Sequence, residues 1–185
     1  MDIITTTGFA SKIITTIGIN AVCSSITTIT SAARSIGEVI NGISRSSTPD
    51  KKNVIDLLNR LDLEETIKVV DSMLKEISRD NLESNTLQLC LDSLIDILKK
   101  IEFELKRIDY MLKYNSNIWI LSSFRSHDCT SNMKKIEEYK NILDVRLKRF
   151  VNMLKIKEEF SKNETKSTVK EDLVDIKISC EDSLV

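Results

Sequence analysis

The sequence predicts an all-α fold: an up-and-down four-helix bundle followed by a flexible C-terminal tail. Apolar residues recur in alternating steps of three and four along several long stretches, which is the spacing of one face of an α-helix. Only four glycines and one proline interrupt the 185 residues, so few positions favour turns or short strands. Hydrophobic residues make up 41% of the chain, which is enough for a core in a single domain.

The N-terminal segment, residues 1–47, is rich in Thr, Ile and Ser, and Lys12 is its only charge between Ile3 and Ala33. We expect a helix here that ends near Gly42, a residue type that commonly terminates helices. One face carries the hydroxyl side chains of Ser24, Thr28, Ser31 and Ser35. The opposite face carries an aliphatic stripe, formed by Val22, Ile26, Ile29, Ala33, Ile36, Ile40 and Ile43.

This N-terminal helix has two interpretations. Residues 13–33 have the length of a transmembrane span, but many Ser, Thr and Asn side chains make insertion marginal. The first interpretation is a buried helix of the bundle. The second is a helix that packs in the bundle in one state and enters a membrane in another. Burial of Ile26, Ile29, Ile36 and Ile40 would argue against a constitutive span.

The second predicted helical region covers residues 53–78. We expect a break near Asp62, with Asp62 as the N-cap and Glu65 completing a capping box. The stripe that follows consists of Leu63, Ile67, Val70, Leu74 and Ile77.

The strongest pattern lies within the third predicted helix, residues 85–114. Its unbroken stripe consists of Leu87, Leu91, Leu94, Leu98, Ile101, Leu105, Ile108 and Leu112. Charged residues fill the remaining positions, and we expect them, Glu104 included, on the solvent side. The stripe runs for about 40 Å, so this helix needs partners along its whole length, and the other helices must supply them.

The last predicted helix covers residues 131–157, and Lys140 stands where one more apolar residue is expected. Its stripe consists of Ile136, Leu143, Leu147, Phe150 and Leu154. Before it, residues 118–125 contain the only tryptophan, and we expect them to cover one end of the bundle or to form an extra short helix. After Lys157 the pattern fails, so residues 158–185 are predicted to form the flexible tail.

No catalytic, cofactor-binding or metal site is predicted, and we therefore expect a protein that is not an enzyme. The four cysteines form no C-x-x-C pair and there is one histidine, which disfavours a zinc site. The glycines match no phosphate-binding loop. His127 lies close to Cys129, but neighbouring residues rarely provide the geometry of a nucleophile and its base. We interpret His127 as a loop residue, with Asp128 near a helix start.

The formal net charge of −1 gives no general attraction to nucleic acid. We expect a protein partner, while membrane lipid and a second copy of the chain stay open as further partners. Basic residues of the last helix form either a solvated face or a surface for an acidic partner or anionic lipid. The candidates for membrane or partner contact are Phe9, Ile13, Ile17, Trp119, Phe124, Arg146, Lys148 and Arg149.

The N-terminus shows no signal-peptide pattern, and the cysteines are typical of a reducing compartment. We therefore expect a cytoplasmic protein, with peripheral membrane association as an open alternative.

Residues 87–94, the following Ile-Leu-Lys-Lys-Ile-Glu-Phe-Glu-Leu run, and residues 119–125 before the last helix resemble segments of helical cell-death bundles. These bundles include the fungal HeLo-type domains and the N-terminal four-helix bundle of the MLKL family, and the resemblance spans residues 1–157. It implies a soluble bundle whose N-terminal helix is released into a membrane, acting in or against cell-death or immune signalling. The chain lacks a kinase-like region, so it would be a stand-alone effector or a decoy in a host–virus interaction. The alternative is a scaffold or decoy bundle that binds another protein without membrane activity.

Overall fold

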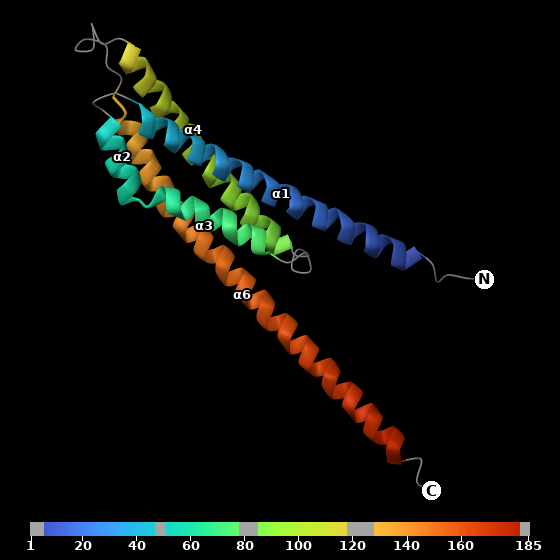
Figure 1. Ribbon diagram of the computed structural model, residues 1–185. Helices are drawn as coiled ribbons and strands as arrows, with labels where there is room; N and C mark the ends of the chain where they lie inside the picture. Colours follow the sequence, from blue (N-terminus) through green and yellow to red (C-terminus); the bar gives the residue numbers. More distant parts are fainter. Residues whose placement is uncertain (1–5, 47–50, 78–84, 118–127, 182–185) are drawn as a thin grey trace.

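The computed structural model describes residues 6–46, 51–77, 85–117 and 128–181, with side chains for residues 20–46, 51–77, 85–116 and 128–159. These residues form helices α1 (Thr6–Arg45), α2 (Lys51–Arg60), α3 (Leu63–Glu76), α4 (Asn85–Asn117) and α6 (Thr130–Glu181). None of the described residues lies in a strand, so the predicted all-α class is confirmed. The chain direction alternates from α1 to α2 and α3, then to α4 and to α6, as in an up-and-down bundle (Figure 1).

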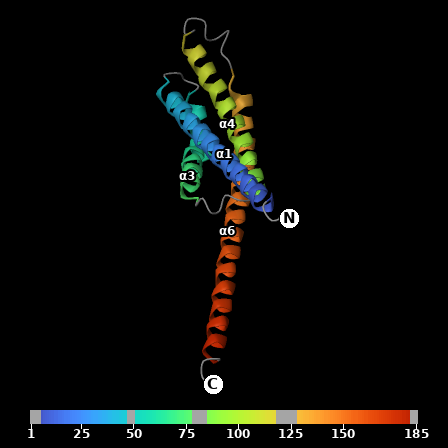
Figure 2. The same cartoon turned by 90° about the vertical axis from the view of Figure 1, so that its right-hand side faces the viewer.

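Helix α4 is the central element of the bundle. It packs on α1 and on α6, while α2 and α3 pack on α1 (Figure 2). All eight residues of its predicted stripe are fully buried, which confirms that prediction. Each such aliphatic side chain contributes about 1.5–3 kcal/mol when it leaves water, so this stripe is a major source of stability.

The buried surface of α4 is wider than the predicted stripe. Ile97 and Glu104 are also buried, and Glu104 is covered by α6, whose Asn132 and Lys135 donate hydrogen bonds to it. The prediction that Glu104 faces solvent is therefore wrong, since Glu104 is only 3% exposed.

Helix α1 runs parallel to α4 in a constant register. Ser25 Oγ lies 3.2 Å from Asp92 Oδ1, and Ser35 Oγ lies 2.6 Å from Glu102 Oε1, each pair being 67 residues apart. Gly42 faces Asp109, again 67 residues further along the chain. Equal separations at three levels mean that the two helices advance side by side in the same direction.

The aliphatic stripe of α1 packs inside the bundle. Ile29, Ile36, Ile40 and Ile43 are buried, and Ile26 is partly buried against the core. This is the arrangement expected of a bundle helix. Within the described residues, no helix contains an apolar window long enough to cross a bilayer.

The predicted stop at Gly42 is wrong, because α1 continues to Arg45. No described glycine has a positive φ, so Gly42 is an ordinary helical residue. A Cβ at this position would lie 3.6 Å from Asp109 Oδ1. The glycine therefore lies at the α1–α4 contact, and a Cβ would fit there at an ordinary contact distance.

The predicted break near Asp62 is confirmed, since α2 ends at Arg60 and α3 begins at Leu63. The predicted side-chain cap is wrong: Asp62 has a left-handed backbone with φ of 49° and makes no side-chain capping bond. An N-cap side chain reaches the helix from an extended backbone, whereas Asp is one of the few residues that tolerate the left-handed region. Asp62 therefore forms the turn through its backbone.

Helix α6 continues to Glu181, so the predicted end of the last helix at residue 157 is wrong. No Gly or Pro follows Lys157 to end the helix. In both views the second half of α6 leaves the bundle without another described helix beside it (Figures 1 and 2). The short helix predicted at 118–125 lies outside the described residues.

Candidate interaction surfaces

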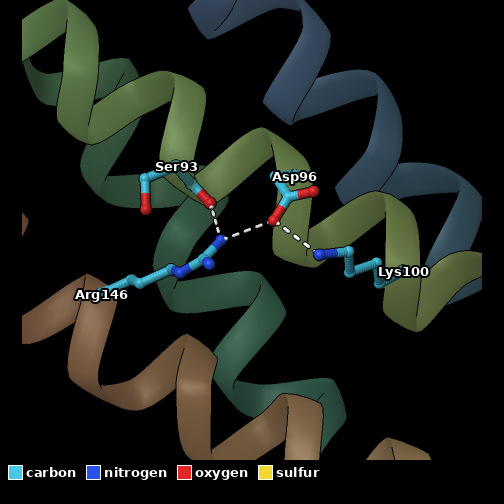
Figure 3. Close-up of polar contacts among 4 residues, drawn as sticks. All are labelled: Ser93, Asp96, Lys100 and Arg146. Carbon is cyan, nitrogen blue, oxygen red and sulfur yellow. Dashed lines mark hydrogen bonds and ion pairs between the residues drawn. The ribbon is translucent and has the colours of Figure 1, made fainter.

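Arg146, one of the predicted contact residues, joins α6 to α4. Its Nη1 donates to the Ser93 carbonyl oxygen at 2.5 Å and to Asp96 Oδ2 at 3.0 Å (Figure 3). Lys100 Nζ also lies 3.0 Å from Asp96 Oδ2. Hydrogen bonds from Lys100 and Arg146 hold the pKa of the Asp96 carboxyl below its ordinary value. Arg146 therefore acts within the bundle and is not a freely presented cation.

The other basic residues of α6 divide into two groups. Lys135 Nζ lies 3.2 Å from Glu104 Oε1, and the buried Lys140 pairs with Asp144 at 2.7 Å. Lys140 occupies the gap in the apolar stripe, where its aliphatic stem packs and its amine reaches Asp144. Lys148 and Arg149, both predicted contact residues, are exposed. Only part of the predicted basic face is thus presented to solvent.

Glu104 is the centre of a buried polar contact between α4 and α6. Asn132 Nδ2 donates to Glu104 Oε2, and Lys135 donates to the other carboxylate oxygen. Asn132 is itself buried, at the first turn of α6. The preceding Asp128 accepts from the Thr130 backbone N–H at 2.9 Å, which places Asp128 at the start of this helix as expected.

Hydroxyl and carboxylate groups line the edges of the α1–α4 contact. Gln88 Nε2 donates to Ser25 Oγ and to Asp92 Oδ1, at 2.7 Å each. Burial raises the pKa of Glu102, but hydrogen bonds from Lys106 and Ser35 outweigh this effect, so its pKa is lowered overall. These contacts fix the relative position of the two helices, and Ser35 comes from the hydroxyl face predicted for α1.

A third face of α4 carries large side chains that are exposed to solvent on either side of the Arg146 contact. Leu89, Phe103 and Tyr110 are 69%, 59% and 67% exposed. They belong to one helical line with steps of four and three, which we call the outer stripe: Leu89, Ser93, Asp96, Lys100, Phe103, Arg107, Tyr110 and Tyr114. The sequence reasoning missed this surface, although the same spacing that identified the core stripe also identifies it.

The aromatic half of the outer stripe is an organised surface. The Arg107 Cζ lies 5.7 Å from the centre of the Phe103 ring, within the range of a cation–π contact. The rings of Tyr110 and Tyr114 stack with centroids 6.5 Å apart. Phe103, Arg107 and Tyr110, together with Lys106 and Met111, line a shallow groove. Large exposed side chains are therefore held in place by one another.

A second groove lies between α1 and α3. Gly37 leaves open space on α1, since nothing lies within 4 Å of where its Cβ would be. The charged residues on the α3 side pair with each other: Lys68 with Glu64 at 3.0 Å, and Lys75 with Asp71 at 2.5 Å. The charges of Lys68 and Lys75 are therefore satisfied within α3.

Most of the remaining predicted site residues have side chains that the structure does not describe. Phe9, Ile13 and Ile17 lie on the first part of α1, and their side chains are not among those described. Trp119, Phe124 and His127 lie outside the described residues. Cys129 is buried in the core. Among the described residues, no group of His, Cys, Asp and Glu side chains is arranged to hold a metal ion.

No protein-family model, curated protein or solved structure matches this chain.

Proposed function

We propose that this protein is a non-enzymatic interaction module that binds another protein through the outer stripe of α4. The observation that carries the proposal is the exposure of Leu89, Phe103 and Tyr110 along one face of the central helix. Exposed apolar groups that gather on one face commonly mark interaction sites, whereas scattered ones need no explanation.

The rigidity of α4 supports this role. The helix is buried against α1 and α6, so the outer stripe is presented from a fixed backbone. A surface that is already ordered loses little conformational entropy on binding, and more of the contact energy remains as affinity. Aromatic and arginine side chains are also enriched among residues that dominate binding energy.

A photoreactive amino acid at position 103 tests the proposal in cells. We expect it to form covalent adducts with another polypeptide, because Phe103 lies in the proposed contact. The matched control places the same amino acid at Ile156, an exposed apolar position on α6. Adducts from position 103 should disappear on adding Y110A, with the helical circular dichroism unchanged. Equal adducts from both positions, or none from position 103, would contradict the proposal.

Peripheral membrane association is a second candidate, and the length of α1 favours it. In the register shared with α4, the first residue of α4 lies opposite Gly18, so residues 6–17 extend beyond it (Figure 1). Phe9, Ile13 and Ile17 lie on this extension. Its release to a membrane would fit the resemblance to cell-death bundles and the proposed role in, or against, that signalling.

Vesicles of phosphatidylcholine mixed with phosphatidylserine test this second candidate. Deleting residues 1–17 should abolish co-sedimentation and leave the circular dichroism of the bundle intact, because it keeps the described buried residues of α1, from Val22 to Ile43. A larger deletion, to residue 33, would also remove core residues and could not separate binding from folding. Unchanged co-sedimentation of the shorter variant would reject the membrane role.

A further inference from the structure

We infer that the outer stripe of α4 docks an amphipathic helix of another protein, and that this helix carries acidic side chains beside its apolar face. The inference rests on the proposed interaction role and adds the chemistry of the partner. Three observations carry it: the shape of the stripe, the position of Arg107, and the local balance of charge.

The shape of the stripe suits a helix. Leu89, Phe103 and Tyr110 lie on a straight line that is about 30 Å long at the rise of an α-helix. Phe103 and Tyr110 are two turns apart, and both line the groove together with Met111. Such a spacing accepts a side chain from a facing helix between two ridges of α4. A small ligand would use only a fraction of this length.

Arg107 places a cation between Phe103 and Tyr110 in the outer stripe. Its guanidinium lies over the Phe103 ring, next to Tyr110 in the groove. A partner that covers Phe103 and Tyr110 also removes water from Arg107. A buried cation without an opposite charge is strongly unfavourable, whereas a carboxylate forms charge-assisted hydrogen bonds with it. The partner should therefore carry Asp or Glu where it meets Arg107.

The charges around the stripe also favour an acidic partner. The carboxylates of this part of α4 already have cationic partners: Glu102 with Lys106 at 2.5 Å, Asp109 with Lys113 at 2.6 Å, and the buried Glu104 with Lys135. Arg107 adds a positive charge beyond these three ion pairs, and Lys99 further lowers the pKa of Glu102. Complementary charge on a partner would orient it and speed its association.

A membrane surface is the less favoured occupant. Anionic lipid also offers apolar and negative groups, but the exposed Asp92 and Asp96 place carboxylates on the same face of α4 as Leu89. A helix with a few acidic residues avoids these carboxylates, whereas a continuous anionic surface does not.

The test uses a display library of amphipathic helical peptides with randomised flanking positions, selected against the full-length protein. We expect enrichment of Asp and Glu next to an apolar i, i+3, i+7 pattern. The selected peptides should bind R107E at least about tenfold more weakly and lose binding to the double variant F103A/Y110A. Selection against R107E itself should enrich Lys and Arg at the same positions. The matched control is K155E, the same charge change at an exposed site of α6, which should leave the affinity unchanged.

Several outcomes would overturn the inference. One is a selection that yields no binder, and another is a set of binders insensitive to F103A/Y110A. If R107E and R107Q bind the selected peptides as tightly as the wild type does, the partner does not need acidic side chains. Co-sedimentation of the full chain with phosphatidylserine vesicles that F103A/Y110A abolishes would replace the helix by a membrane. The proposed interaction role is judged separately, by the adducts from position 103, so it survives if only the chemistry of the partner is wrong.

Discussion

Glu104 is the most buried carboxylate among the described residues, and both of its oxygens accept hydrogen bonds. Asn132 is buried beside it, whereas the side chain of Lys135 is 43% exposed. The hydrogen bonds from Asn132 and Lys135 therefore differ in how much they stabilise the fold. An exposed ion pair contributes little, but a buried acceptor that loses its donor keeps the cost of its lost hydration.

The prediction at Glu104 concerns these two partners. N132A should lower the free energy of unfolding by about 1–3 kcal/mol, because it leaves a buried carboxylate oxygen without its donor. K135A should cost less than about 1 kcal/mol, since water can replace the exposed amine. Urea denaturation of both variants measures the difference. A larger loss in K135A than in N132A would show that Glu104 is solvated.

Glu102 links the stability of the α1–α4 contact to pH. Its pKa is lowered in the folded protein, so its ionised form stabilises the fold above its ordinary pKa, which is 4.5. This contribution is lost as the pH falls from that value through the lowered pKa of the folded state. E102Q should therefore be less stable than the wild type at neutral pH, and the difference should shrink as the pH falls below 4.5. A difference that is constant between pH 7 and pH 3 would contradict this account.

At the scale of the element, the two glycines of α1 that the structure describes in detail are both helical. Glycine inside a helix costs about 0.5–1 kcal/mol relative to alanine. At Gly37 a Cβ meets open space, and at Gly42 it meets Asp109 at an ordinary contact distance of 3.6 Å.

G37A and G42A should therefore each raise the free energy of unfolding by about 0.5–1 kcal/mol, measured by urea denaturation. The result at residue 42 also distinguishes a helical Gly42 from a Gly42 that ends the helix. If Gly42 ended the helix in a left-handed conformation, alanine there would destabilise the protein.

The core of each helix could be predicted from the sequence, because burial against one neighbour follows a period of three and four residues. The stripes of α1, α3 and α4 are buried as this rule requires, except that Ile26 and Ile77 are partly buried. The burial of Glu104 could not be predicted in the same way, since it depends on α6 covering a second side of α4. A charged residue in a periodic pattern gives no sign that a distant Asn132 will meet it.

The candidate site was predictable only in part. Arg146 was selected as a surface cation, but its role depends on Ser93 and Asp96, which are about fifty residues away in sequence. Phe103 and Tyr110 carried a usable signal, because they share a helical line with Leu89. The spacing shows this line, but its exposure to solvent follows only from the positions of α1 and α6.

At the scale of the whole molecule, the bundle and the second half of α6 differ in how far they pack against other helices. Residues 87–112 have neighbours on two sides, whereas residues 160–181 extend away from every other described helix (Figure 1). An isolated helix of this length is marginal in water. The sequence indicated this difference in packing, although not the helical backbone itself.

Amide hydrogen exchange of the intact chain, followed by mass spectrometry, tests the central claim that α1 is a permanently packed partner of α4. We predict that residues 22–43 and 87–112 exchange together at the slowest rate, because each is buried against the other and opens only on global unfolding. Residues 160–181 should exchange much faster. Exchange of residues 22–43 at the fast rate of residues 160–181 would show that α1 leaves the bundle readily, and would contradict the account.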